Sequence, residues 1–127
     1  MNLKTKKIIA LSAFLLILLN FVVRPYLKKQ EGVKVVKKVL SLWKNNDLTF
    51  AFNYWQDPQN CPPVYDLQSY KIIKAEFYTE KKVLKARLFI ILEFPAGNIM
   101  PSGKEWVFEI AYSPVGWQII SMAQVIN

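Results

Sequence analysis

The sequence predicts an α+β domain that follows a membrane-spanning helix, and three observations support this fold class. The first is an apolar run near the N-terminus, residues 8–23, with three lysines before it. The second is an amphipathic stretch, residues 31–45, in which apolar residues recur every three or four positions. The third is a pair of long stretches, residues 83–94 and 104–112, in which apolar side chains alternate as they do in strands with one buried face.

Charge is distributed unevenly along the 127 residues. The first thirty residues contain six of the seventeen lysines and arginines and no acidic residue, whereas the remaining chain is close to neutral, at +2. A nucleic-acid-binding domain needs a basic patch on the folded part. We therefore expect no nucleic-acid partner and expect the N-terminal segment to meet anionic membrane lipid.

Residues 1–29 are predicted to form an uncleaved signal anchor. Sixteen helical residues span about 24 Å, and extending the helix to Leu27 makes it long enough for a roughly 30 Å hydrocarbon core. The chain after the apolar run lacks the small residues that signal peptidase requires, which favours an uncleaved anchor. A cleaved signal peptide is the alternative. A buried helix of a soluble domain is a further alternative. The residues expected to contact lipid are Ile8, Leu11, Phe14, Leu15, Leu18, Phe21 and Val22.

The sequence supports two orientations of residues 30–127 relative to the membrane. A count of the lysines and arginines that flank the apolar run places the domain in the cytoplasm. The short basic tail before a short apolar run instead resembles an export signal. We expect a single-pass membrane protein with an extracytoplasmic domain.

Two helices are predicted at the start of the domain. In residues 31–45, Val33, Val36, Leu40 and Trp43 form an apolar stripe opposite a lysine-rich face. Asn45 to Asp47 end this helix and cap a second one, residues 48–55, which is so apolar that we expect it to be largely buried.

Four antiparallel strands are predicted after a loop over residues 56–69, in which Cys61 is expected to be a partly exposed thiol. The first strand, residues 70–79, should direct Ile73, Ala75 and Phe77 to the core, and Glu80-Lys81 should form the hairpin turn. Strands over residues 83–94, 104–112 and 117–125 complete a meander with the helices on one face.

The other face of the sheet is expected to be mixed. Lys85 or Arg87 should pair with Glu105 or Glu109 across strands. Apolar residues are also numerous there, which indicates a dimer or partner interface, although a partly apolar surface without a function is the alternative. The predicted partner face comprises Phe89, Ile91, Val107, Ile120 and Met122.

The order of elements resembles the nuclear transport factor two-like (cystatin-like) superfamily. The resemblance covers residues 31–127 and rests on Trp43-Lys-Asn-Asn-Asp-Leu48, Phe52-Asn-Tyr-Trp55 and the terminal pattern from Gly103-Lys-Glu-Trp-Val-Phe108 to Gly116-Trp-Gln-Ile119. It implies a cone-shaped domain in which two helices lie across a curved four-stranded antiparallel sheet. Anchored domains of this kind also resemble extracytoplasmic assembly proteins of bacterial secretion and conjugation machines.

The residue content favours binding over catalysis. The chain has no histidine and one cysteine, so the commonest general base and multi-thiolate metal sites are excluded, and the predicted inward positions carry no carboxylate. We therefore expect no enzyme, cofactor or metal, but a binding or scaffold domain whose partner is a second copy or a protein of a membrane complex. An alternative is an apolar ligand, such as a lipid, lined by Trp55, Trp106, Tyr112 and Trp117, which otherwise form ordinary core.

Overall fold

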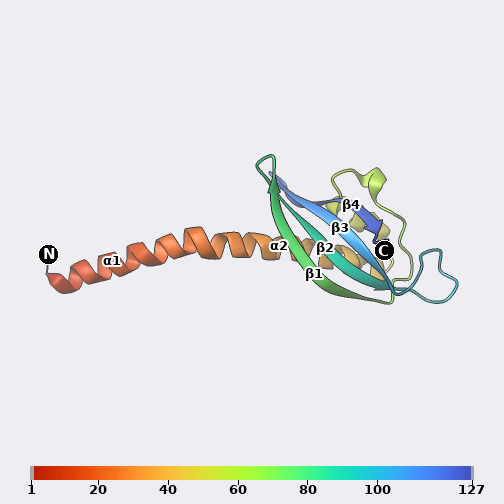
Figure 1. The fold of residues 1–127 in the computed structure, drawn as a ribbon, viewed down its shortest axis with the longest axis horizontal. Coiled ribbons are helices and arrows are strands. Elements are labelled where there is room, and N and C mark those ends of the chain that lie inside the picture. Colours follow the sequence, from red (N-terminus) through yellow and green to blue (C-terminus); the bar gives the residue numbers. More distant parts are fainter. Residues whose placement is uncertain (1, 127) are drawn as a thin grey trace. The chain divides into compact units, whose positions relative to one another are not determined.

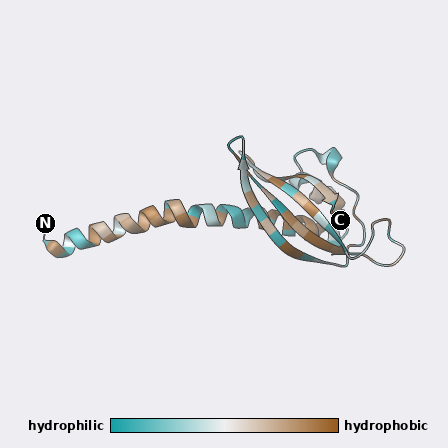
Figure 2. Cartoon of the chain, viewed as in Figure 1, coloured by the Kyte–Doolittle hydropathy of each residue, from teal (hydrophilic) through white to brown (hydrophobic). Residues whose placement is uncertain are grey.

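The computed structural model describes residues 2–126 and divides the chain into two compact units, residues 1–30 and 31–127. In the first unit, helix α1 (Leu3–Leu18) is followed by a π-helical turn (Leu19–Val23) and by the start of α2 (Arg24–Lys44). Asn2 caps α1, since its side chain accepts a hydrogen bond from the backbone N–H of Thr5 at 2.8 Å. Figure 2 shows the apolar character of α1.

The second unit is an α+β domain, as predicted. After α2 come a short helix α3 (Leu48–Ala51), 3-10 turns at Phe52–Tyr54 and Pro58–Asn60, and an antiparallel sheet of four strands in the order β1-β2-β3-β4. Figure 1 shows the sheet curving around the C-terminal part of α2. The strand bounds agree with the predicted ones to within one residue. They are β1 (Ser69–Glu80), β2 (Val83–Glu93), β3 (Lys104–Ser113) and β4 (Gly116–Gln124).

The predicted apolar stripe of α2 forms the centre of the core. Val36, Leu40 and Trp43 are fully buried, while the lysines on the opposite face are exposed. Trp43 packs against Phe108 of β3, with ring centroids 6.0 Å apart. The fully buried strand residues against which α2 lies are Ala86, Leu88, Ile90, Leu92, Phe108, Ile110 and Ile119.

The second helix is shorter and more exposed than predicted. Asp47 caps it as expected, accepting a hydrogen bond from the N–H of Phe50 at 3.4 Å. The α-helix ends at Ala51, however, and the Phe50 side chain is 60 % exposed. A single helical turn can bury only one side, so the all-round apolar pattern overestimated burial. Trp55 leaves the helix and forms a parallel bridge to Ile119 of β4.

Ile73 does not face the core, because β1 contains a bulge between Ile72 and Lys74. Ile72 pairs with the buried Ile90, whereas Ile73 is an extra residue without a cross-strand partner and is 46 % exposed. A bulge inserts one residue and changes which side chains face inward on either side of it. Ile72 thus occupies the core position predicted for Ile73, and Phe77 keeps its predicted one.

The first hairpin turns one residue later than predicted. Glu80 pairs with Val83, so Lys81 and Lys82 are the two turn residues, and both have positive φ, 50° and 66°. Positive φ at both central positions is typical of a type I′ turn, which matches the twist of the flanking strands. Lysine is an unusual residue there because its Cβ disfavours the left-handed region.

Cys61 is buried, contrary to the prediction of a partly exposed thiol. The segment after the 3-10 turn at residues 58–60 runs along the core and buries Cys61, Val64 and Leu67. Burial raises the pKa of the Cys61 thiol from 9.0 to about 11. The sequence of this loop gave no periodic pattern from which its contribution to the core could be read.

Candidate functional site

The N-terminal unit presents apolar side chains on its whole circumference. All seven residues predicted to contact lipid are exposed, with values from 37 % for Leu18 to 77 % for Phe21. By length and composition the N-terminal helix could cross a membrane. An exposed apolar surface of this extent is unfavourable in water and favourable in hydrocarbon.

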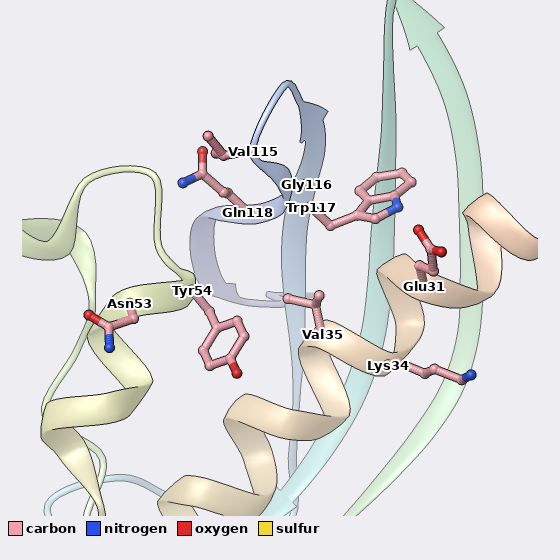
Figure 3. Close-up of a pocket in the computed structure, with 9 residues that line it drawn as sticks. All are labelled: Glu31, Lys34, Val35, Asn53, Tyr54, Val115, Gly116, Trp117 and Gln118. Atoms are coloured by element: carbon pink, nitrogen blue, oxygen red, sulfur yellow. The ribbon is translucent and has the colours of Figure 1, made fainter.

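A pocket of about 480 Å³ lies in the second unit, between the first turns of α2 within the domain, the 3-10 turn and the β3–β4 turn. Its size is within the range of small-molecule sites. In Figure 3 the Tyr54 ring points toward Val35, whereas the Lys34 side chain extends away from Tyr54 and Gln118. The lining residues are Glu31, Lys34, Val35, Asn53, Tyr54, Val115, Gly116, Trp117 and Gln118.

This pocket is lined by both apolar and hydrogen-bonding side chains. Trp117 is 5 % exposed and Val35 packs against the core. The Tyr54 hydroxyl and the amides of Asn53 and Gln118 can donate and accept hydrogen bonds. Such a surface suits a small ligand with both apolar and polar parts. Sequence reasoning missed it because its walls come from three separate segments.

The four aromatic residues predicted to line a ligand cavity do not share one. Tyr112 and Trp117 are brought together, with ring centroids 5.6 Å apart, but Tyr112 lines a different hollow of about 410 Å³. Trp55 is 2 % exposed and belongs to the core, against which Trp106 packs. The buried indole N–H groups of Trp55 and Trp106, and that of Trp43, find no hydrogen-bond acceptor within residues 2–126.

The predicted partner face is largely where the sequence placed it. Phe89 and Val107 are cross-strand partners, and Ala123 lies opposite Val107, so these three residues form an apolar row across the outer face, with Lys74 opposite Phe89 at its end. Ile91 lies beside Glu105 on the same face. These apolar side chains are half-buried, and α2 covers the opposite face of the sheet.

Met122 is the exception, because β4 contains a second bulge. Glu109 pairs with Ser121 and Ile110 with Ile119, so Ile120 is the extra residue. Beyond the bulge the alternation is reversed, and Met122 lies opposite the fully buried Phe108. Met122 therefore packs against the core, and the outer face comprises Phe89, Ile91, Val107 and Ile120.

A network of charged and aromatic groups flanks the apolar row. Arg87 pairs with Glu109 in register, as predicted, and its guanidinium lies 4.6 Å from the centre of the Tyr78 ring. The Tyr78 hydroxyl donates a 2.7 Å hydrogen bond to Glu109 Oε1. Partial burial, this hydrogen bond and the charge of Glu109 raise the pKa of Tyr78, while Arg87 opposes the shift.

A second cation lies on this face next to the apolar row. The Lys74 ammonium is 4.5 Å from the centre of the Phe89 ring and 3.2 Å from Glu76 Oε1. Exposed ion pairs contribute little to stability. On this face, the ion pair and the neighbouring Arg87 and Glu109 place charges of both signs around Phe89 and Val107. A polar rim of this kind is typical of a protein–protein interface.

Clusters of metal-binding side chains and buried carboxylates are absent from the part of the chain that the structure describes. Within residues 2–126 no three His, Cys, Asp or Glu side chains come close enough together to hold a metal ion. The fully buried side chains of this part of the chain are hydrophobic. The carboxylates of Glu76, Glu93 and Glu109 lie on strand positions that face away from the core.

Comparisons with known proteins give no relative from which a role could be transferred. The chain matches no protein family, no curated protein and no solved structure at a significant level.

Proposed function

We propose that this protein is a single-pass membrane protein whose α+β domain is a binding or scaffold module. The observation that carries the proposal is the pairing of an apolar helix, exposed on all sides, with a domain that leaves one face of its sheet uncovered. In this proposal the helix attaches the chain to lipid, and the domain provides contacts to a partner.

The outer face of the sheet is the proposed partner site. Its centre, Phe89 and Val107, is apolar, and its rim carries Lys74, Arg87 and Glu109. A second copy of this chain is a suitable first partner, because a two-fold axis would superpose an apolar centre on itself and bring rim charges of opposite sign together. A protein of a larger membrane complex is the other partner class.

A small ligand in the pocket of Figure 3 is the second candidate function. The volume of about 480 Å³ and the buried ring of Trp117 favour it. This site replaces the cavity predicted from the four aromatic residues, since Trp55 and Trp106 lie elsewhere.

We also propose that the domain is extracytoplasmic and belongs to the nuclear transport factor two-like architecture. The helix laid across a curved antiparallel sheet supports the second point. Protease protection in membrane vesicles of known orientation tests the first. Digestion of the domain only in vesicles that expose the extracytoplasmic side is expected, and digestion only in inverted vesicles would place it in the cytoplasm.

Intact-complex mass spectrometry of the full chain, extracted in mild detergent, tests the partner site. We expect a dimer or a defined protein complex that Phe89→Glu abolishes, because a carboxylate would then be buried in the apolar centre. The same substitution at Phe50, which is 60 % exposed but lies on α3, should leave the complex intact. A monomer that carries a small-molecule adduct would instead favour the pocket, and equal effects of both substitutions would reject the outer face.

A further inference from the structure

Two hairpin turns lie at the same end of the sheet. Lys85 of β2 pairs with Ala111 of β3, just after the β1–β2 turn and just before the β3–β4 turn. The tips are Lys81-Lys82 in the first turn and Pro114-Val115 in the second. The opposite end of the sheet contains the loop between β2 and β3.

The chain enters the domain at this same end. A Cβ atom at Gly32 would lie 3.0 Å from the ring of Trp117, the second residue after Val115. Gly32 follows Leu27, the last residue of the predicted membrane segment, by five positions. Even a fully extended chain covers only about 18 Å over five residues. The short covalent connection therefore limits how far Gly32, and with it the β3–β4 turn beside Trp117, can lie from a surface that the anchor crosses.

The two ends of the domain differ in charge. At the end with the tips, Lys34, Lys81, Lys82 and Lys85 outnumber Glu31 and Glu80. At the opposite end, four acidic residues outnumber three basic ones. The acidic residues are Asp47, Asp66, Glu93 and Glu105, and the basic ones are Lys44, Lys71 and Lys104.

The second tip adds an apolar side chain to this basic end. Val115 is 80 % exposed, and Pro114 beside it is also exposed. Lysines near an anionic surface are attracted to it, and an apolar side chain between them gains by entering the interface. A lipid surface offers both contacts at once, because it presents phosphate groups over hydrocarbon.

We propose that the end of the domain formed by Lys81, Lys82 and Val115 docks on the anionic leaflet through which its own anchor passes. The lysines lie at the lipid phosphates and Val115 enters the headgroup layer. This inference rests on the proposed membrane anchor, and it adds a second, electrostatic contact that fixes how the domain faces the bilayer.

Depth-dependent fluorescence quenching tests the proposal on the full chain. In a Cys61→Ser background, an environment-sensitive dye is attached at Val115→Cys or, as the matched control, at Ile99→Cys in the β2–β3 loop, where the side chain is 96 % exposed. The quencher is a lipid with a spin label near the headgroup. In vesicles rich in phosphatidylglycerol we expect the dye at position 115 to be quenched at least about twofold more than at position 99. In vesicles of phosphatidylcholine alone the difference should shrink.

Two further arms separate the possible failures. Resistance of the full chain to alkaline carbonate extraction from the same vesicles reports the anchor. Extraction of the protein would overturn both the anchor and the docking. Retention with equal quenching at the two positions would overturn the docking alone.

The electrostatic contribution to docking is tested with the double variant Lys81→Gln and Lys82→Gln, and separately with added salt. Both should reduce quenching at position 115, because salt screens exposed charges. The matched double variant Lys44→Gln with Lys104→Gln, at the opposite end, should leave quenching unchanged. The salt series needs no lysine substitution, so it tests the electrostatic contact even if a lysine variant folds poorly. If neither added salt nor the Lys81 and Lys82 substitutions change quenching at position 115, the proposed role of these lysines is refuted.

Discussion

Replacement of Gly32 by alanine is expected to destabilise the domain, although helix propensity predicts the opposite. In an exposed helix, alanine is more favourable than glycine by about 1 kcal/mol. In this structure, however, a Cβ at position 32 would lie 3.0 Å from Cδ2 and from Cε2 of Trp117 and 3.1 Å from Cδ1 of Ile110. These distances are shorter than ordinary van der Waals contacts, so the buried side chains of Trp117 and Ile110 would have to move by a few tenths of an ångström.

Two opposing terms set the magnitude. Overpacking a well-filled site costs about 1–3 kcal/mol, from which the propensity gain of about 1 kcal/mol is subtracted. We expect a net loss of about 1 kcal/mol for Gly32→Ala. For a domain of this size, that corresponds to a decrease in Tm of roughly 4–8 °C. Thermal unfolding of the full chain in mild detergent, followed by near-ultraviolet circular dichroism of the tryptophans, measures it.

A double-mutant cycle with Trp117→Leu isolates the cause. Leucine removes the ring that the new methyl group would meet, so Gly32→Ala should become neutral or stabilising in that background. We expect a coupling of about 1–2 kcal/mol between the two positions. If Gly32→Ala stabilises the wild-type chain by the full propensity gain, α2 does not approach Trp117 as closely as the structure shows, and the reasoning is refuted.

Three further predictions concern the turn, the thiol and the second bulge. Lys81→Asn with Lys82→Gly should stabilise the domain by about 1 kcal/mol, because these residues tolerate positive φ; an unchanged Tm would contradict a type I′ turn. Cys61 should react with iodoacetamide at pH 8 roughly 100-fold more slowly than an exposed thiol of pKa 9.0, because its pKa of about 11 reduces the thiolate fraction; a rate equal to that of the unfolded chain would refute its burial. Met122→Lys should lower Tm strongly whereas Ile120→Lys should have a small effect, and the reverse order would exclude the bulge in β4.

The strands could be predicted because their side chains follow a simple rule. In β2, every second residue from Ala86 to Leu92 is fully buried, and such alternation leaves one choice of face. The stripe on α2 was predictable for the same reason, since Val36, Leu40 and Trp43 recur at helical spacing. The cap at Asp47 follows from its side-chain chemistry.

The rest depended on contacts between distant parts of the chain. Nothing within residues 56–69 indicates that Cys61 and Val64 are buried, because an irregular segment has no periodicity to read. The exposure of Phe50 follows from the early end of α3, which local composition did not show. The pocket at Tyr54 and Gln118 is formed by segments that meet only in the folded domain.

The two errors in strand register have a common physical origin. Each bulge occurs at a pair of adjacent isoleucines, Ile72-Ile73 in β1 and Ile119-Ile120 in β4. Two identical apolar residues in succession fit the core equally well by composition, so alternation cannot decide which of them faces inward. Both strands are at the edges of the sheet, so each bulge interrupts pairing with a single neighbouring strand. A bulge also bends its strand and increases its twist. The extra residues Ile73 and Ile120, which interrupt the alternation of apolar side chains, therefore also contribute to the curvature of the sheet around α2.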